Sequence, residues 1–180
     1  TFQLYRSDRL AFIKQMHTLA TECGYILGAK LVRGAYMEKE RKRAALMGYA
    51  SPINPTKGST DELYDHALNY CIDHLDSFGI IVASHNEKSN LLAVRKLLEN
   101  GHSLQHSHIH WSQLYGMSDN ITFNLANAGC GVSKYLPFGP IEDVVPYLMR
   151  RAQENTSVKG QTGRELGLIQ KELARRAQSA

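Results

Sequence analysis

Cysteine is scarce in this chain of 180 residues, which contains only Cys23, Cys71 and Cys130. No two of them have the spacing of a metal-binding pair, and three scattered cysteines give no disulfide framework. We therefore expect a reducing, intracellular setting and no structural disulfide.

Long apolar runs and nucleotide-binding glycine motifs are also missing. Without a run of about twenty apolar residues, no helix is expected to span a membrane, and no signal peptide opens the chain. The sequence has no phosphate-binding loop and no G-x-G-x-x-G motif, which argues against a Rossmann-type dinucleotide site. Residues 1–5 already resemble a strand and lack a start methionine, so we interpret the amino terminus as an internal cut.

Neither positive nor negative charge is in large excess. The chain has 21 basic and 17 acidic residues, a formal net charge of +4 and no long basic block, which gives little support to nucleic-acid binding. The basic bias gathers near the end, at Lys171, Arg175 and Arg176. We interpret these residues as a solvated helix face, with contact to an acidic membrane surface as the alternative.

The chain does contain a regular alternation of short apolar runs and longer helical patterns. Expected strands lie at residues 1–5, 25–32, 80–84, 108–111 and 132–136, and expected helices at 8–23, 60–78, 87–100, 119–128, 140–154 and 162–177. This alternation predicts an α/β fold with a parallel sheet and crossover helices. Five βα units fit either an open doubly wound sheet or part of a (β/α)8 TIM-type barrel. A missing start favours part of the barrel, and on size we expect one domain.

Local signals mark several boundaries. Ser7 or Asp8 should cap the first helix, Ser59 has the capping-box spacing from Glu62, and Pro140 suits a first helical turn. Residues 51–58 form a loop by composition. Such a loop either closes over a ligand or, more commonly, is a plain surface connection.

Two adjacent arginines, Arg150 and Arg151, lie on an otherwise apolar helix. A guanidinium can hold a carboxylate through two parallel hydrogen bonds, so the pair suits a carboxylate-bearing ligand. The alternative is an ordinary surface pair between Arg150 and Glu154, which are four residues apart.

Polar residues also follow the expected strands. Lys30 lies inside an apolar strand, where a lone charge needs either a ligand or an acidic partner within the barrel. Gly34 and Ala35 allow a flat ligand to approach the backbone closely. His85, beside Ser84 and Asn86, is either a ligand contact or a satisfied core residue.

Three alternating histidines, His106, His108 and His110, raise the question of a metal site. A metal-dependent barrel hydrolase would usually add an acidic residue at a late strand end, and residues 132–139 contain none. We therefore expect no metal, and place these histidines, partly exposed, at the start of their strand.

Five ordered strings carry a family resemblance. They are residues 30–36 (Lys-Leu-Val-Arg-Gly-Ala-Tyr), 83–86 (Ala-Ser-His-Asn), 113–117 (Gln-Leu-Tyr-Gly-Met), 135–139 (Tyr-Leu-Pro-Phe-Gly) and 147–155 (Tyr-Leu-Met-Arg-Arg-Ala-Gln-Glu-Asn). Together they resemble proline dehydrogenase, also called proline oxidase, over nearly the whole chain. The resemblance implies a distorted (β/α)8 barrel that binds FAD non-covalently. It also implies oxidation of L-proline to Δ1-pyrroline-5-carboxylate, with electrons passed to a membrane quinone.

The resemblance also assigns roles to residues. Arg150 and Arg151 would hold the proline carboxylate, Tyr135 would pack on the substrate ring, and Tyr36 would line the same pocket. The implied FAD contacts are Gln3, Lys30, Arg33, Gly34, Ala35, Ser84, His85, Asn86 and Glu154. The implied location is cytoplasmic and peripheral at the inner membrane, which is the mitochondrial inner membrane in a eukaryote.

The chain departs from the family pattern in two ways. Bifunctional bacterial members have Arg where this chain has Lys30, and Trp where it has Met37, so we expect a single-function enzyme. The resemblance begins at the fourth barrel strand, so the family's active-site lysine and aspartate from earlier strands are missing. We expect these 180 residues alone to be inactive and to bind FAD poorly. The alternatives are a hydroxyproline dehydrogenase, a non-catalytic folded fragment and a metal-dependent hydrolase.

Overall fold

Seven helices alternate with five strands in the computed structural model, which describes the backbone of residues 1–157 and 161–178 and the side chains of residues 1–151 and 166–178. The elements are β1 (Phe2–Gln3), α1 (Arg9–Glu22), β2 (Leu27–Val32), α2 (Met37–Met47), α3 (Lys57–Asp73), β3 (Phe78–Val82), α4 (Glu87–Glu99), β4 (Ile109–Leu114), α5 (Asp119–Asn127), β5 (Val132–Tyr135), α6 (Ile141–Ser157) and α7 (Gln161–Gln178).

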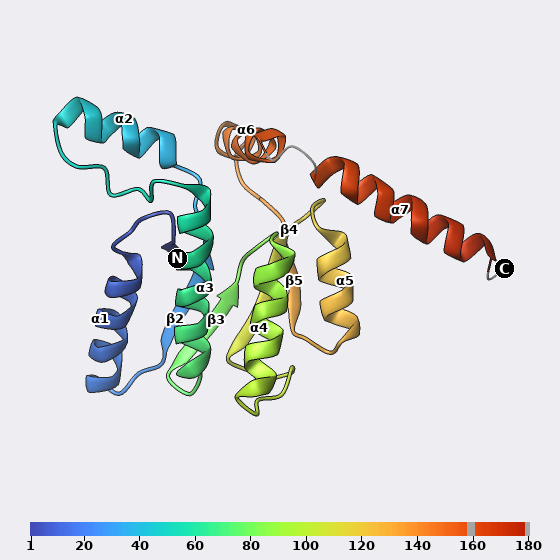
Figure 1. The fold of residues 1–180 in the computed structure, drawn as a ribbon, viewed down its shortest axis with the longest axis horizontal. Helices are drawn as coiled ribbons and strands as arrows, with labels where there is room; N and C mark the ends of the chain where they lie inside the picture. The colour runs from blue at the N-terminus through green and yellow to red at the C-terminus, as the bar shows by residue number, and fades with distance from the viewer. Residues whose placement is uncertain (158–160, 179–180) are drawn as a thin grey trace.

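The five strands form one parallel sheet in the order β1-β2-β3-β4-β5. Figure 1 shows α1, α3, α4 and α5 side by side along one face of this sheet. A doubly wound sheet reverses its strand order and carries helices on both faces. This sheet does neither in the described residues, so it is a segment of a (β/α)8 barrel and the open-sheet alternative is wrong.

The core lies between the sheet and the four helices. Alternate residues of the strands point into it, and Leu31, Ile80, Val82 and Trp111 are at most 2% exposed. The helices contribute fully buried side chains such as Leu68 of α3. Burying a side chain of this size is worth about 1.5–3 kcal/mol relative to leaving it exposed, so these contacts hold the helices on the sheet.

The start of α3 differs from the sequence prediction, whereas α1 starts as predicted but without a cap hydrogen bond. Helix α3 begins at Lys57 because Thr56 caps it, with the Thr56 hydroxyl accepting from the Ser59 amide at 3.0 Å. The capping box expected at Ser59 is therefore wrong. Asp8 does occupy the cap position of α1, but its carboxylate makes no cap hydrogen bond; it binds the guanidinium groups of Arg6 and Arg9. Hydrogen bonds from these two arginines hold the pKa of Asp8 well below its usual range.

Helix α2 was not predicted from the sequence. Its residues are mostly charged, and only Ala44 is buried, so no apolar periodicity announces it. The helix ends at Gly48, whose φ of 72° is the left-handed conformation that glycine adopts without strain.

The loop at residues 51–58 is a packed connection that ends in the first turn of α3. The Asn54 amide donates to the Tyr5 carbonyl at 2.7 Å, and the Asn54 side chain donates to the Leu4 carbonyl at 3.0 Å. Ile53 forms an isolated antiparallel bridge with Arg6. These bonds tie the loop to the segment that follows β1, and whether it also closes over a ligand stays a prediction.

A buried histidine joins α1 to α3 at the end of the sheet remote from α6. His17 Nδ1 lies 2.8 Å from the Tyr70 hydroxyl, and Nε2 lies 2.7 Å from the Ser77 hydroxyl. Ser77 already donates to the His74 carbonyl, so it accepts from Nε2–H, and Tyr70 donates to Nδ1. This tautomer is neutral. Burial, together with the nearby His74, lowers the pKa of His17.

We predict that the free energy of unfolding falls as pH drops below about 6.5, the usual histidine pKa. His17 has a lower pKa in the folded protein, so the unfolded chain takes up a proton first as the pH falls. The stabilisation by neutral His17 is therefore complete only above about pH 6.5. His17→Gln should flatten the decline, measured as urea midpoints between pH 7.5 and 5. His66→Gln, at an exposed position of α3, is the matched control. Identical declines in all three proteins would contradict this role of His17.

Candidate active site

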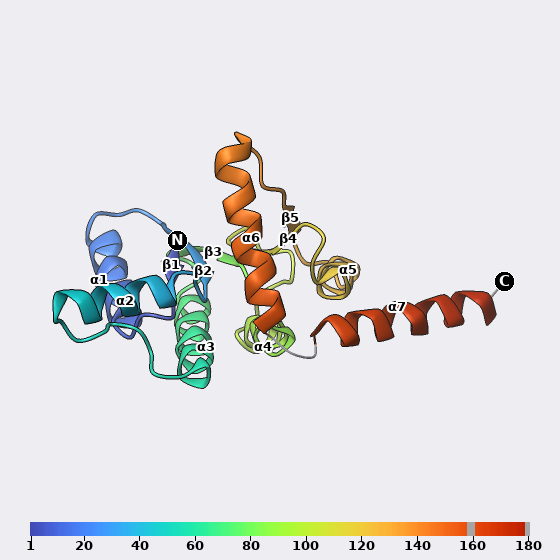
Figure 2. The same ribbon diagram turned by 90° about the horizontal axis from the view of Figure 1, so that it is seen from above.

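The carboxyl ends of the parallel strands gather the predicted site residues at one edge of the sheet. Gln3 ends β1 and Tyr135 ends β5, while residues 33–35 follow β2 and residues 84–86 follow β3. Helix α6, which carries the arginine pair, lies across this same edge (Figures 1 and 2). Barrel enzymes place their chemistry at this end because every strand-to-helix loop opens there.

Lys30 points to the face of the sheet away from the four helices. It lies between Ala29 and Leu31, which are buried on the helix side. Its ammonium nitrogen lies 5.0 Å from the centre of the Tyr135 ring. Among the described residues no carboxylate lies within ion-pair distance of Lys30, so the acidic partner considered from the sequence is not found there. The cation faces an aromatic ring and remains available to a ligand.

Gln3 lies at the same carboxyl edge, paired in register with Val32. Its Oε1 atom is buried and has no hydrogen-bond partner among the described residues. A buried amide oxygen without a partner is costly, and native structures usually satisfy such groups. A ligand with a hydrogen-bond donor would satisfy it.

The arginine pair is packed on tyrosine rings. The guanidinium carbon of Arg150 lies 5.5 Å from the centre of the Tyr36 ring, and that of Arg151 lies 4.9 Å from the Tyr147 ring. Tyr147 in turn meets Tyr135 edge-on at 6.0 Å. The pair therefore belongs to an aromatic cluster, here called the arginine–tyrosine cluster, formed by Tyr36, Tyr135, Tyr147, Arg150 and Arg151.

Helix α6 carries Tyr147, Arg150 and Glu154 in addition to Arg151. Sequence reasoning gave no role to Tyr147, although its position four residues before Arg151 puts both on one helix face. The Glu154 side chain lies outside the described residues, so its predicted FAD contact and its alternative pairing with Arg150 stay predictions. The Nε atom of Arg150 is buried without a hydrogen-bond partner among the described residues.

Arg33 is held by protein groups on all sides. Its Nε binds Asp61 at 2.5 Å, and its two terminal nitrogens donate to the hydroxyls of Ser84 and Ser89, each at 2.9 Å. The Tyr64 ring stacks on the guanidinium at 4.3 Å. Burial raises the pKa of Asp61, but hydrogen bonds from Lys57 and Arg33 have the larger, opposite effect. The net result is a pKa below the usual value. Arg33 and Ser84 thus fix the loops after β2 and β3 to α3 and α4.

Gly34 allows the chain to pass close to Tyr5. Its φ is +102°, and a Cβ built there would overlap the Tyr5 ring. The side chain of Tyr5 therefore occupies the space above Gly34, and burial raises the pKa of its phenol. The next residue, Ala35, is half-buried.

His85 is a neutral imidazole at the end of β3. Its Nδ1 lies 3.0 Å from the Ser118 hydroxyl. Burial, together with the cations Lys134 and Arg151, lowers the pKa of His85 to about 4. At neutral pH the ring therefore carries one proton, and it can offer one donor and one acceptor.

Asn86 caps the next helix. Its Oδ1 accepts from the Ser89 amide at 3.2 Å, at the start of α4. His85 and Asn86 line a cavity of about 470 Å³ that also borders the first turns of α3 and α5. Two cations, Lys57 and Lys88, and two acids, Asp61 and Glu87, line it together with Leu168 of α7. Lys57 is paired with Asp61 at 2.6 Å. The side-chain charges balance, so only the partial positive charge of the helix amino termini favours an anionic group here.

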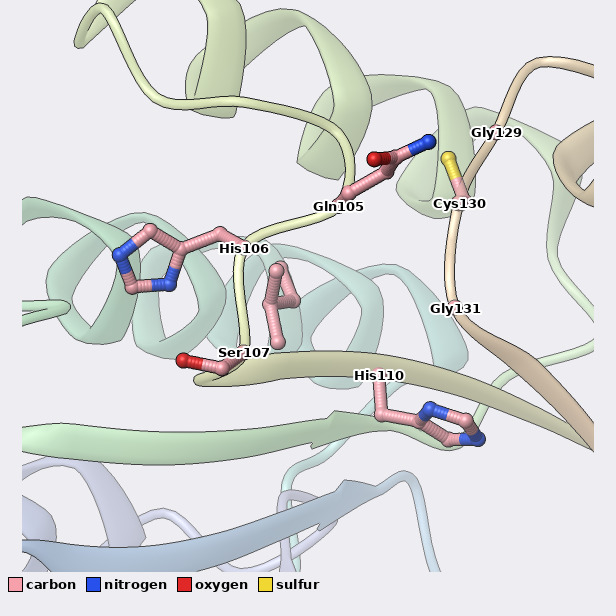
Figure 3. A pocket seen from close by; sticks show the side chains of 8 residues that line it. Gln105, His106, Ser107, His110, Gly129, Cys130 and Gly131 are labelled. Carbon is pink, nitrogen blue, oxygen red and sulfur yellow. The ribbon is translucent and has the colours of Figure 1, made fainter.

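The histidine row lies at the opposite end of the sheet. His106 and His110 border a second cavity of about 260 Å³ between the loops that enter β4 and β5. Figure 3 shows that the two rings point in different directions. In the part of the chain that the structure describes, no three His, Cys, Asp or Glu side chains converge as metal ligands. His106, His108 and His110 are half-buried near the start of β4, as expected.

Known proteins resemble this chain over nearly its full length. The family model for proline dehydrogenase matches residues 1–164. Human mitochondrial proline dehydrogenase 1 is 44% identical over 180 residues, which cover 98% of this chain and 30% of the human protein. The chain belongs to the proline dehydrogenase family.

A curated relative with a different named substrate and a solved structure also resemble this chain. A hydroxyproline dehydrogenase of Xenopus laevis is 41% identical over 180 residues, covering 98% of this chain and 39% of that protein. Proline utilization A from Bdellovibrio bacteriovorus, in a crystal structure inactivated by N-propargylglycine, matches with a TM-score of 0.82 and 25% identity. That match covers 88% of this chain and 16% of the bacterial protein. This chain thus spans less than half the length of each of these relatives.

We predict that the His85 ring does not titrate between pH 5 and pH 8, because burial and two nearby cations oppose protonation. Its proton signals should stay constant over that range in an NMR titration. A midpoint for His85 near 6.5 would contradict the buried, neutral imidazole described above.

Proposed function

We propose that these residues are the carboxyl-terminal portion of a proline dehydrogenase barrel, the last five of its eight βα units. The proposed reaction is the oxidation of L-proline to Δ1-pyrroline-5-carboxylate, with FAD as cofactor and a quinone as electron acceptor. One observation carries the proposal. At the carboxyl edge of the sheet, Lys30 lies against the Tyr135 ring of the arginine–tyrosine cluster.

The arginine pair suits the substrate carboxylate. Proline offers a carboxylate, a secondary amine and an apolar ring. Guanidinium groups bind carboxylates with two parallel hydrogen bonds, and Arg150 and Arg151 are held in place by the rings of Tyr36 and Tyr147. Tyr135 is 44% exposed, which leaves its ring free to pack on the proline ring.

The reaction removes a hydride from C5 of proline and a proton from its nitrogen, leaving a C=N bond. FAD, when bound, supplies the two-electron acceptor for this step. The protein residues then have to orient the ring, exclude water and hold charge. Fixing the carboxylate at one end and an aromatic ring against one face supplies the required orientation. Lys30 provides a fixed positive charge beside the electron-rich reduced cofactor.

The residues present fit a flavin cofactor. The buried Gln3 oxygen lacks a partner among the described residues, and Lys30 lacks an acid. The cavity beside His85 and Asn86 adds helix amino termini, whose partial positive charge favours a pyrophosphate. We assign Gln3, Lys30, His85 and Asn86 to the flavin side. Gly34 and Ala35 would contribute backbone, while Arg33 and Ser84 act mainly by holding the loops. Glu154 remains a predicted contact.

The location is also a proposal. Relatives from human, fly and worm are named mitochondrial. We propose a peripheral association with the mitochondrial inner membrane, or with the inner membrane from the cytoplasm in a bacterium. No described helix is both long and apolar enough to cross a membrane.

Hydroxyproline oxidation is the second candidate, favoured by the 41% identity to the frog hydroxyproline dehydrogenase. The two substrates differ by one ring hydroxyl, and the ring-facing side chain Tyr135 has its own hydroxyl. Single-function activity is expected in both cases, because Lys30 and Met37 stand where bifunctional members have Arg and Trp.

We predict that a complete barrel carrying this sequence purifies yellow with FAD and reduces an artificial dye with proline. Residues 1–180 alone should bind FAD poorly and show no turnover, because the fragment holds only part of the site. Flavin absorbance and a dye-linked assay with proline and hydroxyproline measure both. A complete barrel that purifies colourless would contradict the proposal. Faster turnover of hydroxyproline than of proline would favour hydroxyproline dehydrogenase.

We predict that Arg151→Ala raises the KM for proline by roughly ten- to a hundredfold, since hydrogen bonds to a charged group are worth about 1.5–3 kcal/mol. Steady-state kinetics on the complete barrel measure it. Arg95→Ala, at an exposed position of α4, should leave the KM unchanged. If both variants keep the parental KM, Arg151 does not bind the carboxylate.

A further inference from the structure

Ser118 has an unusual backbone for its residue type. Its φ of 53° and ψ of 43° are left-handed, and no other non-glycine residue in the described part of the chain has a positive φ. Side chains with a Cβ are strained in this conformation. Glycine at this position would relieve the strain, so the serine side chain needs a separate explanation.

Helix capping does not provide that explanation. Ser118 occupies the cap position of α5, where a serine hydroxyl usually accepts from an amide of the first turn. Here the side chain makes no cap hydrogen bond. The hydroxyl lies instead 3.0 Å from Nδ1 of His85, which follows β3, the neighbouring strand. The residue is only 6% exposed, so water does not replace this contact readily.

A frame of buried hydrogen bonds fixes the distance between these two residues. Gln113, 1% exposed, donates from Nε2 to the Ser84 carbonyl at 3.3 Å. The Thr122 hydroxyl of α5 donates to Gln113 Oε1 at 2.9 Å. Gln113 therefore ties the residue before His85 to the helix that begins after Ser118.

Lys134 holds the same turn from the other side. Its ammonium group donates to the Met117 carbonyl at 2.5 Å and forms an ion pair with Asp119 at 2.7 Å. Both partners are direct neighbours of Ser118 in the chain. The turn is thus fixed on β4 through Gln113 and on β5 through Lys134, with the serine hydroxyl directed at His85.

We propose that Ser118 is a positioning residue, whose hydroxyl fixes the ring orientation and tautomer of His85 and thereby the cofactor contact that His85 makes. This inference rests on the proposed function, in which His85 contacts FAD. It explains why a strained serine occupies a turn that glycine would form more easily, because glycine would leave the imidazole free to rotate. Strained backbone held in place by its surroundings is a recurrent feature of functional sites.

The test uses the complete barrel and two variants that lack the hydroxyl. Ser118→Gly relieves the backbone strain, and Ser118→Ala retains it. Both should raise the Kd for FAD by about two- to tenfold, the usual net value of one hydrogen bond. The melting temperature of the FAD-free Ser118→Gly protein should equal or exceed that of the parent, and Ser118→Ala should melt lower. Ser103→Gly, an exposed loop serine at the opposite end of the sheet, should leave the Kd for FAD unchanged.

A double-mutant cycle with His85→Ala separates positioning from general damage. In the His85→Ala background, Ser118→Gly should weaken FAD binding no further. An unchanged Kd in Ser118→Gly, an additive loss in the double variant, or a lower melting temperature in Ser118→Gly would each overturn the inference. These outcomes leave the proposed function intact if the parent barrel binds FAD. A parent barrel that binds none overturns both.

Discussion

In-register parallel pairing divides each strand of this sheet between two environments. Side chains alternate, so one set packs under α1, α3, α4 and α5, while the other faces away from the helices. The first set is apolar, as Leu31, Val82 and Trp111 show. The second set contains Lys30 and Tyr135, which meet across the sheet. Without this division the lysine would enter the core, where a lone charge is too costly to bury.

Polar side chains hold the loops at the carboxyl edge of the sheet in place. Arg33 binds Asp61, Ser84 and Ser89, and so connects β2, α3 and the β3–α4 loop. Asn86 caps α4. A residue at this edge thus shapes the cavity wall even where its side chain does not reach the cavity. Within the family motifs, Arg33, Ser84 and Asn86 make the hydrogen bonds that hold the loops in position.

The strands and most helices were predictable because their apolar periodicity reflects the same burial that forms them. Helix α2 was not, since only Ala44 of its eleven residues is buried. The arginine pair could be proposed from residue chemistry, and most other site residues came from the family resemblance. Their partners depend on contacts distant in the sequence, as between Arg33 and Asp61 or His85 and Ser118. Tyr147 was quoted within a motif, yet its packing on Arg151 required the fold.

Gly34 shows how two physical demands can make a position irreplaceable. Any other amino acid would face both a backbone conformation that it disfavours and a collision with Tyr5. A smaller residue in place of Tyr5 would remove the collision but leave the disfavoured φ of +102° unchanged. Second-site suppression from that neighbour is therefore blocked. Every amino-acid substitution at Gly34 should therefore be deleterious, and its codon should tolerate only synonymous change.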